Sequence, residues 1–151
     1  MSNLTKQQVL DLVPQASPFR FIDEIIELND EGIIASYRFK KNESFYEGHF
    51  PGNPITPGVI LLEAAAQAAV VAFGIYITAK QLPEIEVKQI LTLFTEAEVE
   101  FSGVVKPGDK IIVKSKKVYF RRLKLKSSFE MILEDGTIVC SGSLSGMGVK
   151  A

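Results

Sequence analysis

The sequence has 151 residues, of which 46% are hydrophobic and 23% charged, shares that are ordinary for a globular protein. This length fits one domain over residues 1–151 and leaves no room for a second independent core. The formal net charge is −1, so no overall field favours nucleic acid or an anionic membrane as a partner. The single cysteine, Cys140, excludes a scaffold held together by disulfides.

The N-terminal third predicts a short helix followed by a hairpin. Its first residues lack the apolar core of a signal peptide, so we expect a cytoplasmic protein. Thr5 followed by Gln8 has the pattern of a capping box, which predicts a helix that ends before Pro14. Two segments rich in aromatic and branched residues flank a turn at residues 29–32. They predict strands over Phe19–Leu28 and Ile33–Phe39.

A shaped loop and a long apolar helix follow. Residues 41–58 carry several glycines and prolines, and Thr56 before Pro57 resembles an N-cap with proline at the first helical position. The helix is predicted from about Pro57 to about Ala79. Its apolar stretch from Val59 to Ile77 has about the length that spans a bilayer, but Glu63 and Gln67 interrupt it. Its many alanines favour burial within protein, so we expect no membrane insertion.

The second half predicts strands joined by turn signals. Because one long apolar helix needs a sheet wrapped around it, the expected class is α+β, a curved antiparallel sheet around a central helix. The regular spacing of the strands predicts a meander, with strands over residues 91–101, 110–120, 123–133 and 138–149.

The residues able to do chemistry gather around the helix start. His49 is the only histidine, and Glu63 follows fourteen residues later, inside the apolar helix. Desolvation should raise the pKa of this carboxyl, so that it can act as a general acid near neutral pH. Histidine can act as the complementary base. An acid and a base on different elements suit elimination of water, although a lone histidine or a helical glutamate is more often structural.

Neighbouring groups fit the same chemistry. Gln67 lies four residues after Glu63, on the same helical face, and can orient the carboxylate or the leaving hydroxyl. The backbone amides of Gly58 and Val59 lie at the positive end of the helix dipole. They can polarise a thioester carbonyl and stabilise the enolate formed when an α-proton leaves.

A long motif spans residues 48–67 and has the sequence GHFPGNPITPGVILLEAAAQ. It resembles the signature of the 3-hydroxyacyl-acyl-carrier-protein dehydratases of the FabZ and FabA type, and is similar to the family form GHFPGxPxxPGVLxxEAxAQ at nearly every fixed position. The resemblance extends more weakly over most of the chain. It implies the hot-dog fold and dehydration of 3-hydroxyacyl thioesters on acyl carrier protein to trans-2-enoyl thioesters, without a cofactor.

The resemblance also implies a role for each matching residue. His49 would take the α-proton, and Glu63 would protonate the leaving hydroxyl. Gly58 and Val59 would hold the thioester oxygen, while the Ile55 carbonyl would orient His49. Gln67 completes the expected substrate-binding set. In this family the histidine and the acid of one site come from opposite subunits, so a homodimer is expected, with a trimer of dimers also open.

Several positions depart from the family pattern. Gln15 and Ala16 stand where His-Arg is frequent, and Ser102 with Gly103 replaces residues that are often basic. These departures leave two points open. One is the substrate class, which is a fatty acid chain or a related polyene or polyketide chain, and the other is the contact with carrier protein. An acidic carrier needs a basic docking patch. The candidate cations are Lys114, Lys116, Lys117, Arg121, Arg122, Lys124 and Lys126. They would equally suit a solvated strand edge that is protected by charge.

Two other function classes remain open at this point. A hot-dog thioesterase, or a hydratase acting on coenzyme A esters, shares the fold but leaves the His49 loop unexplained. A non-catalytic acyl-binding subunit is the other alternative, against which the joint presence of His49, Glu63 and Gln67 speaks. Scattered carboxylates around one histidine predict no metal site.

Overall fold

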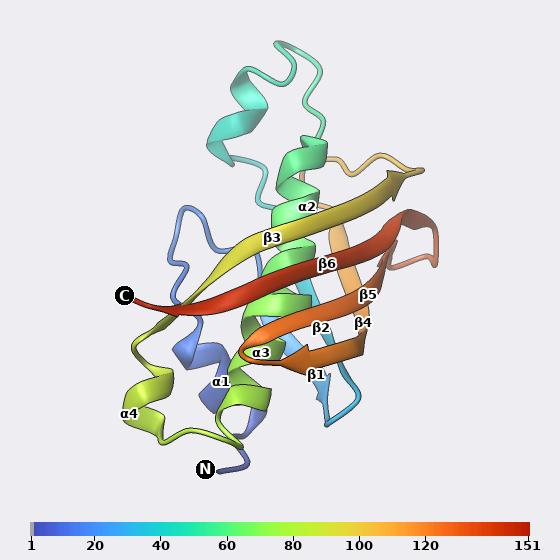
Figure 1. The fold of residues 1–151 in the computed structure, drawn as a ribbon. Helices are drawn as coiled ribbons and strands as arrows, with labels where there is room; N and C mark the ends of the chain where they lie inside the picture. Colours follow the sequence, from blue (N-terminus) through green and yellow to red (C-terminus); the bar gives the residue numbers. More distant parts are fainter. Residues whose placement is uncertain (1) are drawn as a thin grey trace.

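The computed structural model describes residues 2–151 and shows a six-stranded antiparallel sheet curved around one long helix (Figure 1). The predicted α+β class is therefore confirmed. Neighbouring strands in the sheet follow the order β1-β2-β4-β5-β6-β3. Their bounds are Glu24–Leu28 for β1, Gly32–Arg38 for β2, Ile90–Phe101 for β3, Lys110–Arg121 for β4, Lys124–Leu133 for β5 and Ile138–Lys150 for β6.

The predicted meander is wrong for one strand. Strands β4, β5 and β6 are sequential neighbours, but β3 pairs with β6 and so lies at the edge of the sheet. The connection over residues 102–109 explains this placement. At the start of this segment, the Ser102 amide donates a hydrogen bond to the Val139 carbonyl of β6. At its end, the Gly108 amide donates a hydrogen bond to the carbonyl of Phe39, the residue that follows β2. The segment therefore crosses the end of the sheet instead of forming a hairpin.

The central helix runs over Gly58–Thr78 and consists of α2 (Gly58–Ala66), a π-helical turn η2 (Gln67–Ala72) and α3 (Phe73–Thr78). Its length and hydropathy would allow it to cross a membrane, yet 67% of its apolar window is buried inside the protein. The sheet packs against it closely because small side chains face the strands. These buried alanines are Ala64, Ala65, Ala66, Ala68, Ala69 and Ala72.

The π-helical turn is a departure from the uniform helix that the sequence predicts. A wide turn leaves carbonyls outside the regular hydrogen-bond ladder. Within this turn, the Ala69 carbonyl accepts a hydrogen bond of 2.8 Å from the Ser127 hydroxyl of β5. Both groups are buried, so this bond between helix and sheet satisfies a carbonyl that water cannot reach.

The N-terminal segment forms α1 over Lys6–Leu12, with the predicted capping box. The Gln8 amide donates to the Thr5 hydroxyl, and the Gln8 side chain accepts from the Thr5 amide. The first strand is shorter than predicted, because residues 19–22 bond to the central helix and pairing with β2 begins only at Asp23. Two short helices were not predicted, namely η1 (Ser44–Glu47) and α4 (Glu84–Val87).

Candidate active site

The loop that carries His49 extends beyond the sheet at the N-terminal end of the central helix (Figure 1). The His49 amide donates to the Phe45 carbonyl, and its own carbonyl accepts from the Ile55 amide at 2.9 Å. The ring Nδ1 lies 2.8 Å from the Ile55 carbonyl oxygen. Because a carbonyl can only accept, Nδ1 carries the proton in this bond. The Nε2 lone pair is then available to act as a base.

The start of the helix differs from the prediction in one respect. Pro57, not Thr56, occupies the N-cap position, and it makes no side-chain cap. Thr56 is buried, and its hydroxyl bonds to the Tyr46 hydroxyl at 2.6 Å instead, which ties the helix start to η1. Local sequence cannot reveal this partner, because the bond depends on how the loop folds back.

Two backbone amides remain outside the helical ladder. The Ile60 and Leu61 amides both donate to the Pro57 carbonyl, so the helical bonds start with these residues. Gly58 and Val59 precede them as the first two helical residues, and their amides have no acceptor within the helix. Val59 is also exposed. The geometry thus offers two donors at the positive end of the helix dipole, as an oxyanion site requires.

Glu63 is held by Gln67 from the next turn of the helix. The Gln67 Nε2 donates two hydrogen bonds, one of 2.8 Å to Glu63 Oε2 and one of 2.9 Å to the Phe19 carbonyl. Its Oε1 accepts a hydrogen bond of 2.7 Å from the Phe21 amide. Gln67 is fully buried. The hydrogen bond expected from the four-residue spacing is therefore present, and Gln67 also anchors the chain before β1 to the helix.

The surroundings of Glu63 favour its protonated form. Burial raises the pKa of this carboxyl above its usual value, and the hydrogen bond from Gln67 opposes the shift. Burial is the larger effect, as expected for a carboxyl among apolar side chains. Glu63 opens into a pocket of about 30 Å³ lined also by Gln15, Ala66, Val70, Val71, Thr92, Phe94 and Gly146.

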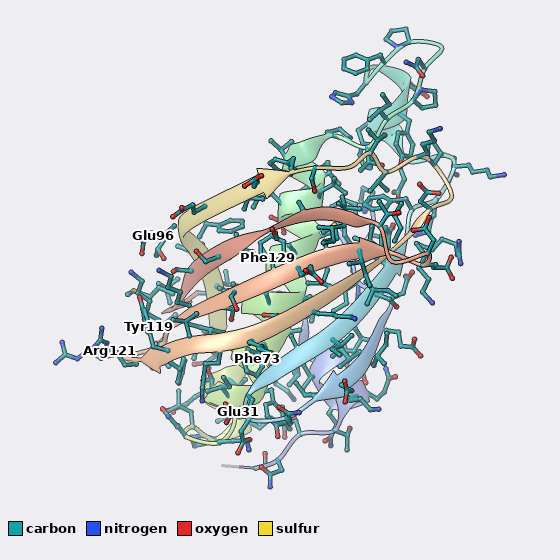
Figure 2. The ribbon with its side chains drawn as sticks, turned by 90° about the vertical axis from the view of Figure 1, so that its right-hand side faces the viewer. Glu31, Phe73, Glu96, Tyr119, Arg121 and Phe129 are labelled. Carbon is teal, nitrogen blue, oxygen red and sulfur yellow. The ribbon has the colours of Figure 1, made fainter. Side chains whose placement is uncertain are left out.

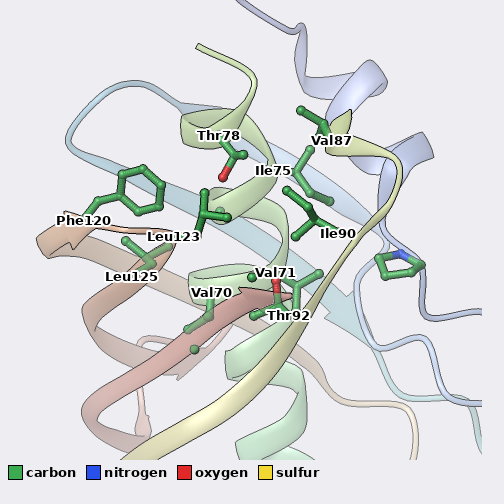
Figure 3. Close-up of a pocket in the computed structure, with 14 residues that line it drawn as sticks. Val70, Val71, Ile75, Thr78, Val87, Ile90, Thr92, Phe120, Leu123 and Leu125 are labelled. Carbon is green, nitrogen blue, oxygen red and sulfur yellow. The ribbon is translucent and has the colours of Figure 1, made fainter. Parts of the chain in front are cut away.

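A second small cavity continues along the helix (Figure 3). It measures about 20 Å³ and lies between the helix, the start of β3 and the end of the β4–β5 hairpin. Val70, Val71, Thr92 and Gly146 line both cavities, so the two adjoin. At Gly146 a Cβ atom would lie 2.4 Å from the Val70 side chain, which is why only glycine fits. The helix thus borders a row of apolar voids that begins at Glu63.

The structure assembles the predicted residues into two groups. Ile55 lies against His49, and Gln67 lies against Glu63, as the sequence predicted. His49 does not line the pocket of Glu63, and within residues 2–151 no hydrogen bond joins the two side chains. Sequence reasoning missed Gln15 as a neighbour of Glu63, because it lies 48 positions earlier in an irregular segment.

Comparisons with known proteins identify the family. The family model of the FabA-like domain matches residues 13–144. The chain belongs to the FabA-like family. The 3-hydroxyacyl-acyl-carrier-protein dehydratase FabZ of Chlamydia trachomatis serovar L2 is 35% identical over 148 residues, which cover 95% of this chain and 92% of the relative. That of Caldicellulosiruptor bescii is 34% identical over 147 residues, covering 95% and 96%. These relatives confirm the predicted dehydratase class within the FabA-like family.

Solved structures confirm the hot-dog fold. The dehydratase heterocomplex of Xenorhabdus doucetiae matches with a TM-score of 0.77 and 13% identity, covering 97% of this chain and 93% of that one. A thioesterase from Haemophilus influenzae matches with a TM-score of 0.68 and 14% identity, covering 99% and 93%. Because dehydratases and thioesterases both match at such low identity, this likeness concerns the fold alone.

Proposed function

We propose that this protein removes water from 3-hydroxyacyl thioesters on acyl carrier protein, giving trans-2-enoyl thioesters for fatty acid or related polyene or polyketide synthesis. The whole chain acts as one hot-dog unit in the cytoplasm. One observation carries the assignment to this site: a half-buried carboxyl with a raised pKa, Glu63, fixed by Gln67 near a helix start with two available amides. Protonation of a leaving hydroxyl needs a carboxyl acid, and a raised pKa makes the carboxyl of Glu63 better suited to that role than an exposed one.

The reaction follows from the roles of these groups. The amides of Gly58 and Val59 bind the thioester oxygen, which makes the α-carbon more acidic. The Nε2 of His49 takes the α-proton, and the Ile55 carbonyl fixes the tautomer that makes this possible. The C3–O bond breaks, and the departing oxygen takes the proton of Glu63. The electrons of the former C2–H bond form the double bond, so water leaves with no change in oxidation state.

The two halves of the site come together through a second copy of the chain. Strand β3 is an edge strand, and its exposed apolar side chains are unusual for an edge left in solvent. They are Leu91, Leu93, Phe94 and Phe101. Phe94 also lines the Glu63 pocket, so a partner covering β3 would lie beside the acid. In a homodimer of this kind, His49 of one subunit serves Glu63 of the other, and a trimer of dimers would repeat the same site.

Mass spectrometry of 3-hydroxyacyl carrier protein tests the reaction. Wild type should remove one water from the acyl chain, whereas His49→Ala and Glu63→Gln should be inactive while remaining folded. Glu24→Gln, at an exposed position of β1, is the control and should behave as wild type. Release of free carrier thiol by wild type would show a thioesterase instead, and an unchanged hydroxyacyl species at every chain length would refute the assignment.

Subunit mixing tests the shared site. Each inactive variant lacks one of the two groups, so a mixed dimer regains one complete site. Combining His49→Ala with Glu63→Gln under conditions of subunit exchange should therefore restore up to about a quarter of the wild-type activity, because half of the dimers are mixed and each has one intact site of two. Failure to regain activity after exchange has been demonstrated would contradict a site shared between subunits.

The β4–β5 hairpin is the proposed docking surface for the acidic carrier. Arg121 projects from its end, with its guanidinium over the Tyr119 ring at 5.1 Å (Figure 2). Lys124 pairs with Glu96 at 3.1 Å, so it contributes less to the patch than the exposed cations around it. Arg121→Glu with Arg122→Glu should raise KM for the carrier-bound substrate and leave KM for a pantetheine thioester unchanged. Lys41→Glu is the control, and equal effects on both substrates would contradict docking here.

A further inference from the structure

Gln15 carries a buried amide oxygen without a hydrogen-bond donor. It follows Pro14 in the irregular segment between α1 and β1, and its Oε1 has no partner among residues 2–151. An unpaired buried acceptor costs folding free energy, so proteins keep few of them. The contrast with Gln67 is direct, because both ends of that amide are bonded to the protein. Gln67 has a visible structural task, whereas the Gln15 amide oxygen makes no bond within the part of the chain that the structure describes.

The unpaired oxygen belongs to a residue that lines the Glu63 pocket. The pocket measures about 30 Å³, and a cavity of roughly 10–15 Å³ already holds one water. Most of its lining is apolar, so a water molecule or hydroxyl there depends on the few polar side chains present. Gln15 supplies an acceptor, and the Glu63 carboxyl supplies a proton. The pocket therefore suits a single small oxygen-bearing group beside the candidate acid.

We propose that Gln15 binds the 3-hydroxyl of the substrate and then the released water, between its amide oxygen and Glu63. This inference rests on the proposed dehydration. The substrate hydroxyl donates its hydrogen to Gln15 Oε1, which turns an oxygen lone pair toward the acid. When the C3–O bond breaks, the oxygen keeps the bonding pair and takes the proton of Glu63. The water formed donates one hydrogen to Gln15 and the other to the Glu63 carboxylate.

This contact makes Gln15 a specificity residue for the hydroxyl. An acyl thioester without a 3-hydroxyl leaves the acceptor unpaired, so it gains nothing at this position. A substrate with the hydroxyl gains a bond and is held with its leaving group toward Glu63. Gln15 thereby distinguishes the substrate from the saturated chain, which differs from it only at C3.

Ligand discrimination in a variant that cannot turn over provides the test. In the His49→Ala background, binding is measured for the 3-hydroxyacyl and the saturated acyl pantetheine thioesters, at an acyl length that wild type dehydrates. Adding Gln15→Met, which keeps the side-chain length and removes the acceptor, should reduce the preference for the hydroxylated ligand about tenfold. Gln81→Met, at an exposed position, is the matched control and should leave the preference unchanged.

A stability measurement separates this role from a structural one. Removing an unpaired acceptor should leave the melting temperature of Gln15→Met unchanged or raise it by about 2–4 °C, while kcat falls about tenfold. A structural residue would lose stability and activity together. An unchanged hydroxyl preference, or a fall in melting temperature that accompanies the loss of activity, would overturn the inference. Absence of any dehydration by wild type would instead refute the proposed function on which it rests.

Discussion

Replacing Gln67 by methionine tests how the fold holds the candidate acid. Methionine keeps much of the volume and shape but removes three hydrogen bonds, which join the side chain to Glu63, to the Phe19 carbonyl and to the Phe21 amide. The change therefore acts on stability and on the chemistry of the carboxyl at once, and the two effects can be measured separately.

The magnitude follows from which groups lose their partner. The Phe21 amide loses its acceptor, the Gln67 Oε1, and because Phe21 is only 2% exposed, water cannot take the place of that acceptor. A buried amide left without an acceptor costs about 1–3 kcal/mol. Phe19 is exposed, and its carbonyl can turn to water at little cost. Together with the lost bond to Glu63, we expect a loss of about 2–4 kcal/mol in the free energy of unfolding. That is a large share of the ~5–15 kcal/mol typical of a domain.

The effect on the acid has a definite sign. The bond from Gln67 lowers the pKa of Glu63, since it stabilises the carboxylate. Without it the pKa rises further. If Glu63 is the acid, the dehydration rate should fall at high pH, where the carboxyl has lost its proton, and this alkaline limb should move to higher pH in the variant.

Urea unfolding followed by circular dichroism measures the stability, and a pH–rate profile measures the acid. The profile is recorded at a temperature where the variant is fully folded. Gln89→Met at an exposed position serves as the control. Stability within about 0.5 kcal/mol of wild type, the range of ordinary surface changes, would refute the structural reasoning. An alkaline limb that does not move would refute the assignment of Glu63 as the acid held by Gln67.

Three further predictions concern the carboxyl, the helix and the sheet edge. Burial raises the folded-state pKa of Glu63 above its ordinary value, so wild-type stability should fall as the pH rises from that ordinary value through the folded pKa. In thermal melts Glu63→Gln should lack this decrease, and parallel curves for the two proteins would argue against it. Ser127→Ala removes the buried hydrogen bond to the Ala69 carbonyl in the π-helical turn and should cost about 1 kcal/mol in denaturant unfolding. A value near zero would be the contrary result. Leu93→Glu on β3 should weaken subunit association in analytical ultracentrifugation. Val118→Glu on β4 is the control, because Val118 is 53% exposed and Leu93 is 54% exposed, and it should leave association unchanged. Equal behaviour of the two variants would exclude β3 as the interface.

Local patterns in the sequence predicted local structure well. The capping box at Thr5 and the bond between Glu63 and Gln67 both depend on fixed spacing within one helix, so sequence distance determines them. The strand bounds agree to within a residue or two over the second half, because turn residues separate runs of alternating polarity. The alanine-rich pattern predicted burial of the central helix on all sides, which holds for its middle turns but not for its start, where Val59 is exposed.

Features set by contacts between distant segments could not be predicted. The position of β3 depends on its pairing with β6, about fifty residues later, and turn residues near Pro107 suggested a hairpin instead. The π-helical turn is stabilised from β5 by Ser127, which has no signature of its own. The residue type and position of Thr56 predicted an N-cap, but its hydroxyl is hydrogen-bonded to the Tyr46 hydroxyl instead. The place of Gln15 beside Glu63 arises only when β3 and β6 close the pocket.

The double attachment of Gln67 affects how related chains should be compared. A descendant that no longer performs the reaction still needs a side chain that fastens residues 19–21 to the helix, so loss of activity alone exerts no pressure to discard this glutamine. His49 lies in a projecting loop, and the hydrogen bond of its ring goes to Ile55 in the same loop, so the fold places little constraint on this residue once turnover is no longer selected. If His49 is the base, as proposed, the histidine should mark a working catalyst among members of the lineage, whereas the glutamine marks the fold.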